Sequence, residues 1–312
     1  MKLTSNLQDN IYALKAILPI GKSFDLLEKT LKIHGRNFHL YFLDGFAKDT
    51  NLEYVRRDIF TLPKETLDQI HTAEELIEYA ISSIEVSTET DLDKLVTALL
   101  AGQTILFFDG SPSAAVIDLR TYPTRGISEP EKEKTIRGAR DGFVETIVFN
   151  TALIRRRVRD PHLIFEMMQI GSLSHTDVAI GYISNKVNKK ALKKVKQLLN
   201  DLQINSLTMG DQTLVEAVHS DSWINPFPKA RYTERPDVAA AQVSEGKIVI
   251  LVDNSPTAII VPTGIFDFIQ DVDDYYVPVL TGNYLRFIRY AILIFNLFLT
   301  PVYVLSLIHI SE

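Results

Sequence analysis

The sequence contains no cysteine, and this absence excludes disulfide bonds, thiolate metal ligands and cysteine nucleophiles. An excess of positive charge is also lacking. Lysine and arginine number 33 and acidic residues 39, and the formal net charge of −6 argues against nucleic acid as a partner. Glycine-rich phosphate-binding patterns, HExxH and GxSxG are missing, and the seven histidines show no metal-ligand spacing. We therefore predict no metal, no cofactor and no catalytic residue.

A secretory signal is lacking as well, because the N-terminal segment carries Asp9 and spaces its apolar residues as an amphipathic helix over residues 3–18. Hydrophobic residues make up 46% of the chain and charged residues 23%, the proportions of a folded protein, and 312 residues suffice for two domains. Hydrophobic periodicity predicts further helices over residues 64–84, 91–101, 186–202 and 211–219, and strands over residues 36–43, 176–183 and 238–241.

The predicted helix over residues 186–202 has an apolar inner face and a basic outer face. The outer face carries Lys189, Lys190, Lys193, Lys194 and Lys196. Such a face either lies on anionic lipid headgroups or is a solvated helix surface, and the sequence leaves both interpretations open.

Two stretches of the chain share one pattern. Residues 102–118 and 246–262 each begin with glycine and reach Asp109 or Asp253 seven residues later, and each aspartate is followed by Gly or Asn and then Ser-Pro. Two apolar runs flanking such a turn predict a β-hairpin in each stretch. The repetition indicates two α/β units related by duplication. We interpret the turn residues as structural, since tight turns require these residue types.

A highly charged segment joins the two predicted units. Residues 123–130 are rich in Pro, Thr and Gly and mark a boundary, and an apolar stripe from Phe143 to Val158 then predicts a helix. Four arginines lie at its end, between Arg155 and Arg159, where positive charges interact favourably with the negative end of the helix dipole. Asp160-Pro161 then ends the predicted helix. The charges favour either a solvated helix with intrahelical pairs or a docking helix.

The C-terminal part differs from the rest of the chain. Residues 290–308 form an uncharged stretch that is long enough for a transmembrane helix, and Arg286 and Arg289 lie just before it. By the positive-inside tendency these arginines place the preceding part on the cytoplasmic side. A buried core helix is the alternative, favoured by Asn296 and Pro301. Because no flank follows this segment, we expect the sequence to be a fragment of a longer protein.

Two long motifs give the chain a resemblance to a known family. RGARDGFVETIVFNTALIRRRVRD, and a PFP element followed by TERPD, resemble the two signatures of the GerA family, the A subunits of spore germinant receptors. Within this family, the segments TYPTRG, EMMQIG and RYTERPDVAA most resemble the stage V sporulation AF branch. The resemblance implies a non-enzymatic subunit of a spore inner-membrane germination complex, with other membrane subunits and membrane lipid as partners, in an oligomer. It further implies that the cytoplasmic part is coupled to an ion-conducting membrane domain.

We therefore predict an α/β fold (α+β, mixed sheets) with two small subdomains joined by a helix and followed by the first transmembrane helix of a membrane domain. The predicted parts are residues 1–125, the joining segment 126–160, residues 161–283 and the transmembrane helix 284–308. The alternative is a soluble ligand-sensing or hydrolytic α/β protein with a hydrophobic C-terminal helix, which would keep its activity when cut after Val279.

Charged and polar residues of the two motifs are our candidates for an interdomain or intersubunit contact. They are Arg137, Arg140, Glu145, Asn150, Arg155, Arg156, Arg157, Thr233, Glu234, Arg235 and Asp237. We hypothesise that the subdomains shift about the joining helix and bias the membrane part between closed and open states. If Arg235 or Arg156 forms a buried pair with Glu145 or Asp237, removing one partner would destabilise the protein by about 3–5 kcal/mol.

Overall fold

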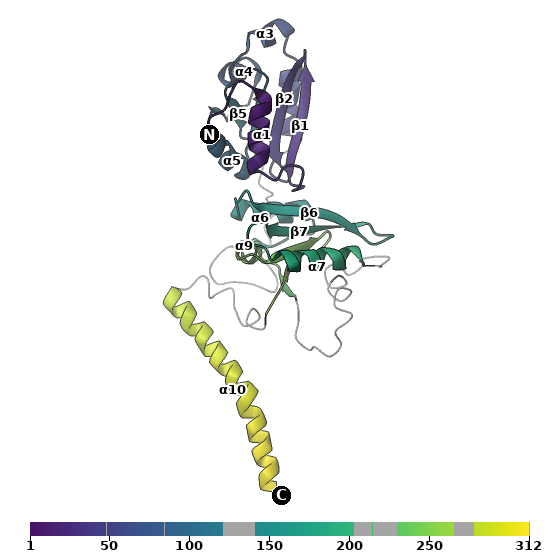
Figure 1. The fold of residues 1–312 in the computed structure, drawn as a ribbon, viewed down its shortest axis with the longest axis vertical. Coiled ribbons are helices and arrows are strands. Elements are labelled where there is room, and N and C mark those ends of the chain that lie inside the picture. Colours follow the sequence, from purple (N-terminus) through teal and green to yellow (C-terminus); the bar gives the residue numbers. More distant parts are fainter. Residues whose placement is uncertain are drawn as a thin grey trace.

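The computed structural model describes residues 1–47, 49–83, 85–120, 141–202, 214, 230–264 and 278–311. Two sheets and a long C-terminal helix follow one another along the molecule (Figure 1). We call the part built on the first sheet the first unit, residues 1–120, and the part built on the second sheet the second unit, residues 141–264. The predicted α/β class with two subdomains is confirmed, and every strand pair in the described residues is antiparallel.

The two sheets have the same strand order. The first contains β1 (Leu26–Ile33), β2 (Arg36–Leu43), β4 (Thr104–Phe108), β5 (Ala114–Ile117) and β3 (Val86–Glu89), in that order across the sheet. The second contains β6 (Leu163–Ile170), β7 (Thr176–Ile183), β9 (Ile248–Val252), β10 (Ala258–Val261) and β8 (Arg231–Thr233). The sequence pattern shared by the two hairpins therefore extends to the whole topology of both units.

Helices cover both faces of each sheet. In the first unit, α1 (Leu7–Ile17) and α5 (Leu92–Leu100) share one core with the sheet, and α2 (Asp49–Phe60), α3 (Lys64–Gln69) and α4 (Ala73–Ala80) form the other. In the second unit, α6 (Ile147–Arg157) and α9 (Pro236–Ser244) cover one face and α7 (Lys189–Asn200) covers the other. Each unit is thus a three-layer sandwich with its own hydrophobic cores.

Most elements predicted from periodicity are present. The strands over residues 36–43 and 176–183 have the predicted bounds, both hairpins form, and Asp91 caps α5 by accepting a hydrogen bond from the Asp93 amide. Gly102, with φ of +97°, follows α5, and a Cβ there would lie 2.6 Å from the Phe46 ring. The predicted helix over residues 211–219 lies outside the described residues except for Leu214.

Two predictions were wrong. The helix predicted over residues 64–84 is divided into α3 and α4, because Thr72 and Glu75 form a capping box that starts a new helix. The strand predicted over residues 238–241 lies inside α9, where Pro236 occupies the first turn and Asp237 favours the positive end of the helix dipole. The joining helix is also shorter than predicted, since α6 begins at Ile147.

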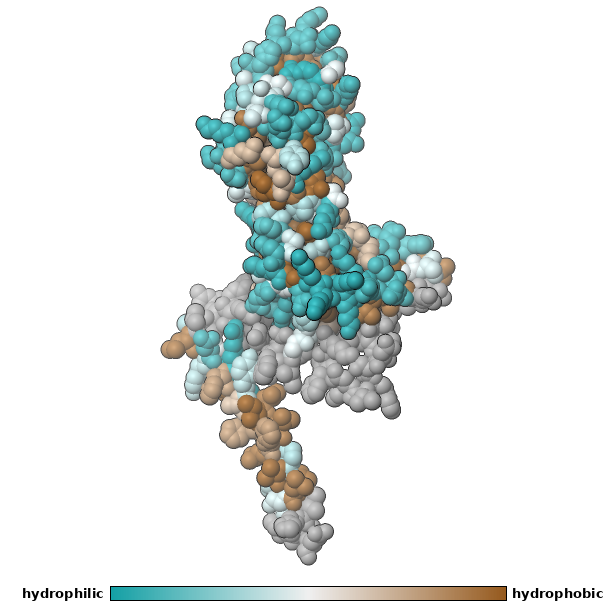
Figure 2. All heavy atoms as spheres, in the orientation of Figure 1, coloured by the Kyte–Doolittle hydropathy of each residue, from teal (hydrophilic) through white to brown (hydrophobic). Residues whose placement is uncertain are grey.

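The C-terminal helix α10 (Val279–Ser311) extends away from both units (Figure 1). Its segment Leu280–Ser306 contains an 18-residue window with a mean hydropathy of 1.8 and no buried residue, so its length and composition fit a membrane span. Figure 2 shows hydrophobic side chains gathered over α10, whereas the visible faces of the two units are mainly hydrophilic. Within the described residues this is the one helix that meets these criteria.

One buried asparagine plays the same part in each unit. The Asn10 side chain accepts from the Thr4 amide at 2.9 Å and donates to the Thr4 carbonyl at 2.7 Å. The Asn150 side chain does the same with the Val144 amide and carbonyl, at 2.8 and 2.5 Å. Each asparagine therefore satisfies a backbone donor and acceptor ahead of the helix that contains it.

We predict that Asn10→Ala and Asn150→Ala each lower the free energy of unfolding by about 1–3 kcal/mol, because each leaves two backbone groups without partners. Urea unfolding followed by circular dichroism measures the change. Asn200→Ala, at an exposed position, serves as the control and is expected to cost less than about 0.5 kcal/mol. Equal midpoints for all three variants would contradict the assigned role.

Candidate functional site

Helix α6 lies between the cores of the two units. Leu153, Ile154 and Val158 belong to the core of the second unit, whereas Ala152 belongs to the core of the first. The first unit approaches α6 closely at Gly45, where an added Cβ would lie 3.1 Å from the Ala152 Cβ atom. A larger side chain at Gly45 would therefore force α6 and the first unit apart.

The start of α6 is held by the second hairpin turn. The Asp253 carboxylate accepts a hydrogen bond from the Ile147 amide at 3.1 Å, and the Asn254 amide donates to the Glu145 carbonyl at 2.8 Å. The carboxylate satisfies a free amide of the first helical turn and lies at the positive end of the helix dipole. The Asp-Asn turn, interpreted above as only a turn, thus also positions α6.

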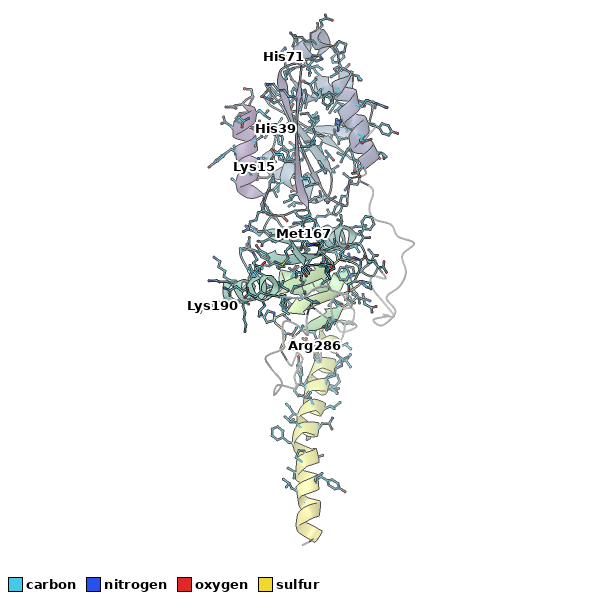
Figure 3. The ribbon with its side chains drawn as sticks, turned by 90° about the vertical axis from the view of Figure 1, so that its right-hand side faces the viewer. Lys15, His39, His71, Met167, Lys190 and Arg286 are labelled. Atoms are coloured by element: carbon cyan, nitrogen blue, oxygen red, sulfur yellow. The ribbon has the colours of Figure 1, made fainter. Side chains whose placement is uncertain are left out.

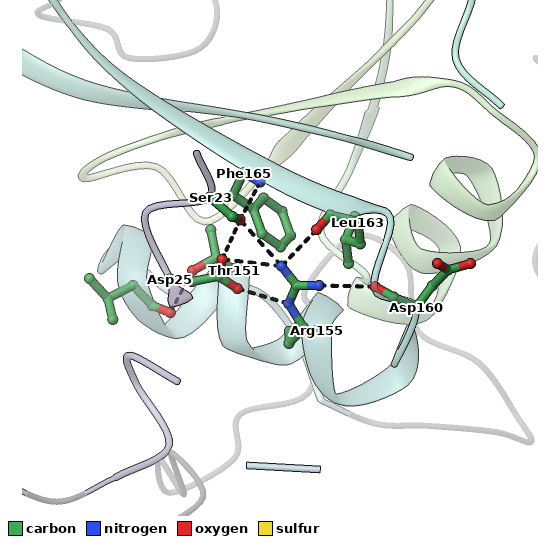
Figure 4. A network of polar contacts seen from close by, with 8 residues as sticks. Ser23, Asp25, Thr151, Arg155, Asp160, Leu163 and Phe165 are labelled. Carbon is green, nitrogen blue, oxygen red and sulfur yellow. Dashed lines mark hydrogen bonds and ion pairs between the residues drawn. The ribbon is translucent and has the colours of Figure 1, made fainter. Parts of the chain in front are cut away.

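The Arg155 side chain, near the end of α6, is completely buried and reaches the first unit (Figure 4). Its guanidinium donates to the two Asp25 carboxylate oxygens at 2.8 and 3.1 Å, to the Leu163 carbonyl at 3.0 Å and to the Asp160 carbonyl at 3.4 Å. It also lies 5.3 Å from the centre of the Phe165 ring. Since Asp25 is itself buried, each charge depends on the other for compensation.

The neighbours of Asp25 extend this contact along the edge of the second sheet. The Ser23 hydroxyl donates to Asp25 at 2.5 Å and accepts from the Phe165 amide at 2.9 Å, and the Phe24 amide donates to the Phe165 carbonyl at 3.0 Å. The Phe24 and Phe165 rings meet edge to face with centroids 6.5 Å apart. Residues 23–25 of the first unit thus bind the outer edge of β6, whose backbone groups need partners.

The repeat shows what is special about Arg155. Lys15 follows Asn10 by five residues, as Arg155 follows Asn150, so Lys15 is the counterpart of Arg155 in the first unit. Lys15 pairs within the first unit with Glu28 at 2.7 Å. Glu28 also accepts from the Tyr41 hydroxyl at 2.7 Å. Burial raises the pKa of Glu28, but hydrogen bonds from Lys15, Tyr41 and His39 outweigh it, and the pKa lies below its ordinary value.

In the second unit, Phe165 and Gly181 replace this acid and tyrosine. Glu28 on β1 is the register partner of Tyr41 on β2, and in the second sheet Phe165 on β6 is likewise the register partner of Gly181 on β7. A Cβ atom at residue 181 would lie only 2.6 Å from the Phe165 ring. No carboxylate stands at the position equivalent to Glu28. The arginine therefore pairs with a carboxylate from the other unit.

The second motif of the resemblance meets α6 in space. The Arg235 guanidinium, 1% exposed, donates to the Asp237 carboxylate at 2.6 and 3.1 Å, and the Arg235 amide donates to the Thr233 hydroxyl at 3.1 Å. The Glu234 carbonyl accepts from the Phe143 amide at 2.8 Å. These residues open α9, which packs on α6, so the two motifs form one cluster within the second unit.

The remaining predicted residues are distributed differently. Glu145 and Arg156 are exposed, Arg157 pairs with Asp141 and donates to the Leu153 carbonyl at 2.9 Å, and Arg137 and Arg140 lie outside the described residues. Of the two arginines proposed for a buried pair, Arg235 pairs with Asp237 two residues away, and the pair is only partly buried, since the Asp237 side chain is 18% exposed. Ser23 and Asp25 were missed, because nothing in the pattern of their loop marks them as partners of a buried arginine.

A metal or ligand site was sought in the same residues. Among the residues that the structure describes, no group of three or more His, Cys, Asp or Glu side chains lies close enough together to hold a metal ion. A shallow groove of about 260 Å³ lies in the first unit, lined by β1, β2 and α2. It lies on the α2 side of the first sheet, away from the Arg155 cluster.

We predict that Arg155→Met lowers the free energy of unfolding by about 3–5 kcal/mol, because it leaves the Asp25 charge buried and unpaired. Asp25→Asn combined with Arg155→Met is expected to recover part of this loss, which a double-mutant cycle in urea measures. Lys15→Met is the matched control: its pair with Glu28 is 41% and 22% exposed, and we expect less than about 1 kcal/mol. Similar losses at Arg155 and Lys15 would refute a buried pair.

The lowered pKa of Glu28 gives a second prediction. A carboxylate whose pKa is lower in the folded than in the unfolded state stabilises the fold above its ordinary pKa of 4.5, and this stability is lost as the pH falls through the folded value. Glu28→Gln should therefore reduce the loss of stability on acidification below pH 4.5. Glu53→Gln makes the same change of charge at an exposed position. Equal acid sensitivity of the two variants would contradict the assignment.

Comparisons with known proteins place the chain among spore proteins. A family model described as Bacillus/Clostridium GerA spore germination protein matches residues 14–312. Stage V sporulation protein AF of Bacillus subtilis is 38% identical over 90% of this chain and 57% of its own length. The uncharacterized membrane protein YfkQ of the same organism is 32% identical over 85% of this chain and 51% of its own length. The chain thus spans little more than half of these relatives.

A solved structure shares the fold. It is the N-terminal domain of the A subunit of the Bacillus megaterium spore germinant receptor GerK3. The match has a TM-score of 0.61 and 25% sequence identity, and it covers 85% of this chain and 98% of that domain.

Proposed function

The chain belongs to the GerA family of spore germination proteins, and on this basis we propose that it is part of a non-enzymatic subunit of a germination complex in the spore inner membrane. Its two units lie on the cytoplasmic side, and α10 enters the membrane as the first span. The units act on an ion-conducting membrane domain during germination. Other membrane subunits of the complex are its partners, in an oligomer.

The buried pair between Arg155 and Asp25 is the observation that supports a coupling role. It joins the two units, and both charges are buried, so the contact has no partly broken form of low energy. A rigid-body shift of the first unit on α6 therefore connects two discrete arrangements. In the proposal, these arrangements bias the membrane domain between closed and open states.

The exposed residues of the cluster are proposed as the contact with other subunits. Arg156 is exposed on α6, and Glu234 of the second motif is partly exposed, so both side chains are accessible to a partner. The hydropathy of Leu280–Ser306 and the basic Arg286 and Arg289 near its start support membrane insertion with the units in the cytoplasm.

The test is germination of spores that carry Arg156→Ala or Glu234→Ala. We expect slower germination and weaker recovery of partner subunits, with unchanged unfolding of the purified chain, because these side chains are not buried in a core. Arg56→Ala, which makes the same substitution as Arg156→Ala at an exposed position of α2, is the control. Germination and partner recovery equal to wild type in both variants would rule out the contact. Full activity of the chain cut after Val279 would favour the alternative of a soluble α/β protein.

A further inference from the structure

Helix α7 concentrates positive charge in an acidic chain. Its 12 residues, KKALKKVKQLLN, include five lysines and no acidic residue, whereas the whole chain has a formal net charge of −6. The apolar side of the helix is packed on the second sheet, with Leu199 buried and Ala191, Leu192 and Val195 partly buried against the core. Asn188 caps its N-terminus by accepting from the amides of Lys190 and Ala191. The helix therefore presents a fixed set of side chains to its surroundings.

Four of these lysines form one exposed face. Lys196 is turned inward, where it pairs with Glu166 and lies 5.3 Å from the centre of the Tyr182 ring. Lys189, Lys190, Lys193 and Lys194 are exposed, and among the described residues no carboxylate pairs with any of them. Their spacing of one, three and four residues puts them on one side of the helix. We call this set the α7 lysine face.

The α7 lysine face has a defined place in the molecule. Helices α6 and α7 cover opposite faces of the second sheet, and α6 is the one that meets the first unit. The α7 lysine face therefore takes no part in the contact between the two units. The second unit lies between the first unit and α10, and Lys190 points outward from it (Figure 3). The face therefore belongs to the unit nearest the candidate membrane span.

We propose that the α7 lysine face docks on anionic lipid headgroups of the membrane that α10 enters, a proposal that rests on the membrane insertion of α10 proposed above. Lysine ammonium groups are compact charges that suit phosphate groups, and four of them near an anionic surface shift the docking equilibrium by about a thousandfold. Docking would fix the second unit relative to the membrane. A displacement between the units would then move the first unit rather than the second.

The absence of native cysteine permits single labels on the 312-residue chain. We would place a fluorophore at Gln197→Cys, an exposed position on the same side of α7, and reconstitute the chain in nanodiscs with a neutral lipid whose headgroup carries a nitroxide quencher. With about 30% phosphatidylglycerol we expect at least about twofold stronger quenching than in neutral discs. The excess should disappear in about 1 M salt, where screening acts over about 3 Å.

Two variants with four substitutions each separate the α7 lysine face from net charge. Substitution of Lys189, Lys190, Lys193 and Lys194 by Gln should abolish the excess quenching. Substitution of Lys2, Lys29, Lys32 and Lys64 by Gln makes the same change of charge on exposed positions of the first unit and should preserve it. Equal quenching in neutral and anionic discs, or equal loss in both variants, would overturn the proposal.

A second label, at Phe295→Cys in α10, separates the proposal from the function it rests on. An environment-sensitive dye there should report an apolar surrounding in both kinds of disc. An aqueous surrounding would overturn membrane insertion, and lipid docking with it. An apolar surrounding without excess quenching at residue 197 would overturn lipid docking alone. If the α7 variant instead loses an acidic partner subunit on co-purification, the face is a protein contact and the lipid proposal fails.

Discussion

The pairing of two buried charges, Arg155 and Asp25, constrains much of the arrangement between the units. A guanidinium buried without a counter-charge would be strongly destabilising, so moving the loop with Asp25 away from α6 is strongly unfavourable. The same loop brings Ser23 and Phe24 to the edge of β6. One electrostatic requirement thus also determines how an exposed sheet edge is covered and where the Phe24 ring packs.

The internal repeat explains how such a contact arises from small changes. The first unit brings its cation, Lys15 on α1, together with a carboxylate and a tyrosine of its own sheet, Glu28 and Tyr41. In the second unit the aromatic ring of Phe165 needs the space that a side chain at residue 181 would take, and Gly181 provides it. A longer reach and several donors let arginine satisfy one carboxylate and two carbonyls at once, which a lysine cannot do with the same geometry.

Local signals in the sequence were sufficient for much of the fold and insufficient for the Arg155 site. Turn residues predicted both hairpins, and apolar spacing with Asp91 and Gly102 predicted α5, because these signals act over a few residues. The short apolar run at residues 238–241 fits strand and helix alike, and Pro236 with Asp237 was the overlooked evidence for a helix. Asp25 lies 130 positions from Arg155 in an unpatterned loop, so its partner follows only from the packing of the two units.

The two ends of α6 are fixed by different units, and this has a consequence for the proposed coupling. Asp253 of the second unit holds its first turn, and Asp25 of the first unit holds its last turn through Arg155. A helix of 11 residues packed on a sheet transmits a displacement at one end with little bending. Movement of the first unit would therefore reach the turn after β9 and the α9 cluster around Arg235 together. Because the ion pair is either made or broken, such a movement would be a transition between two discrete states and not a continuous displacement.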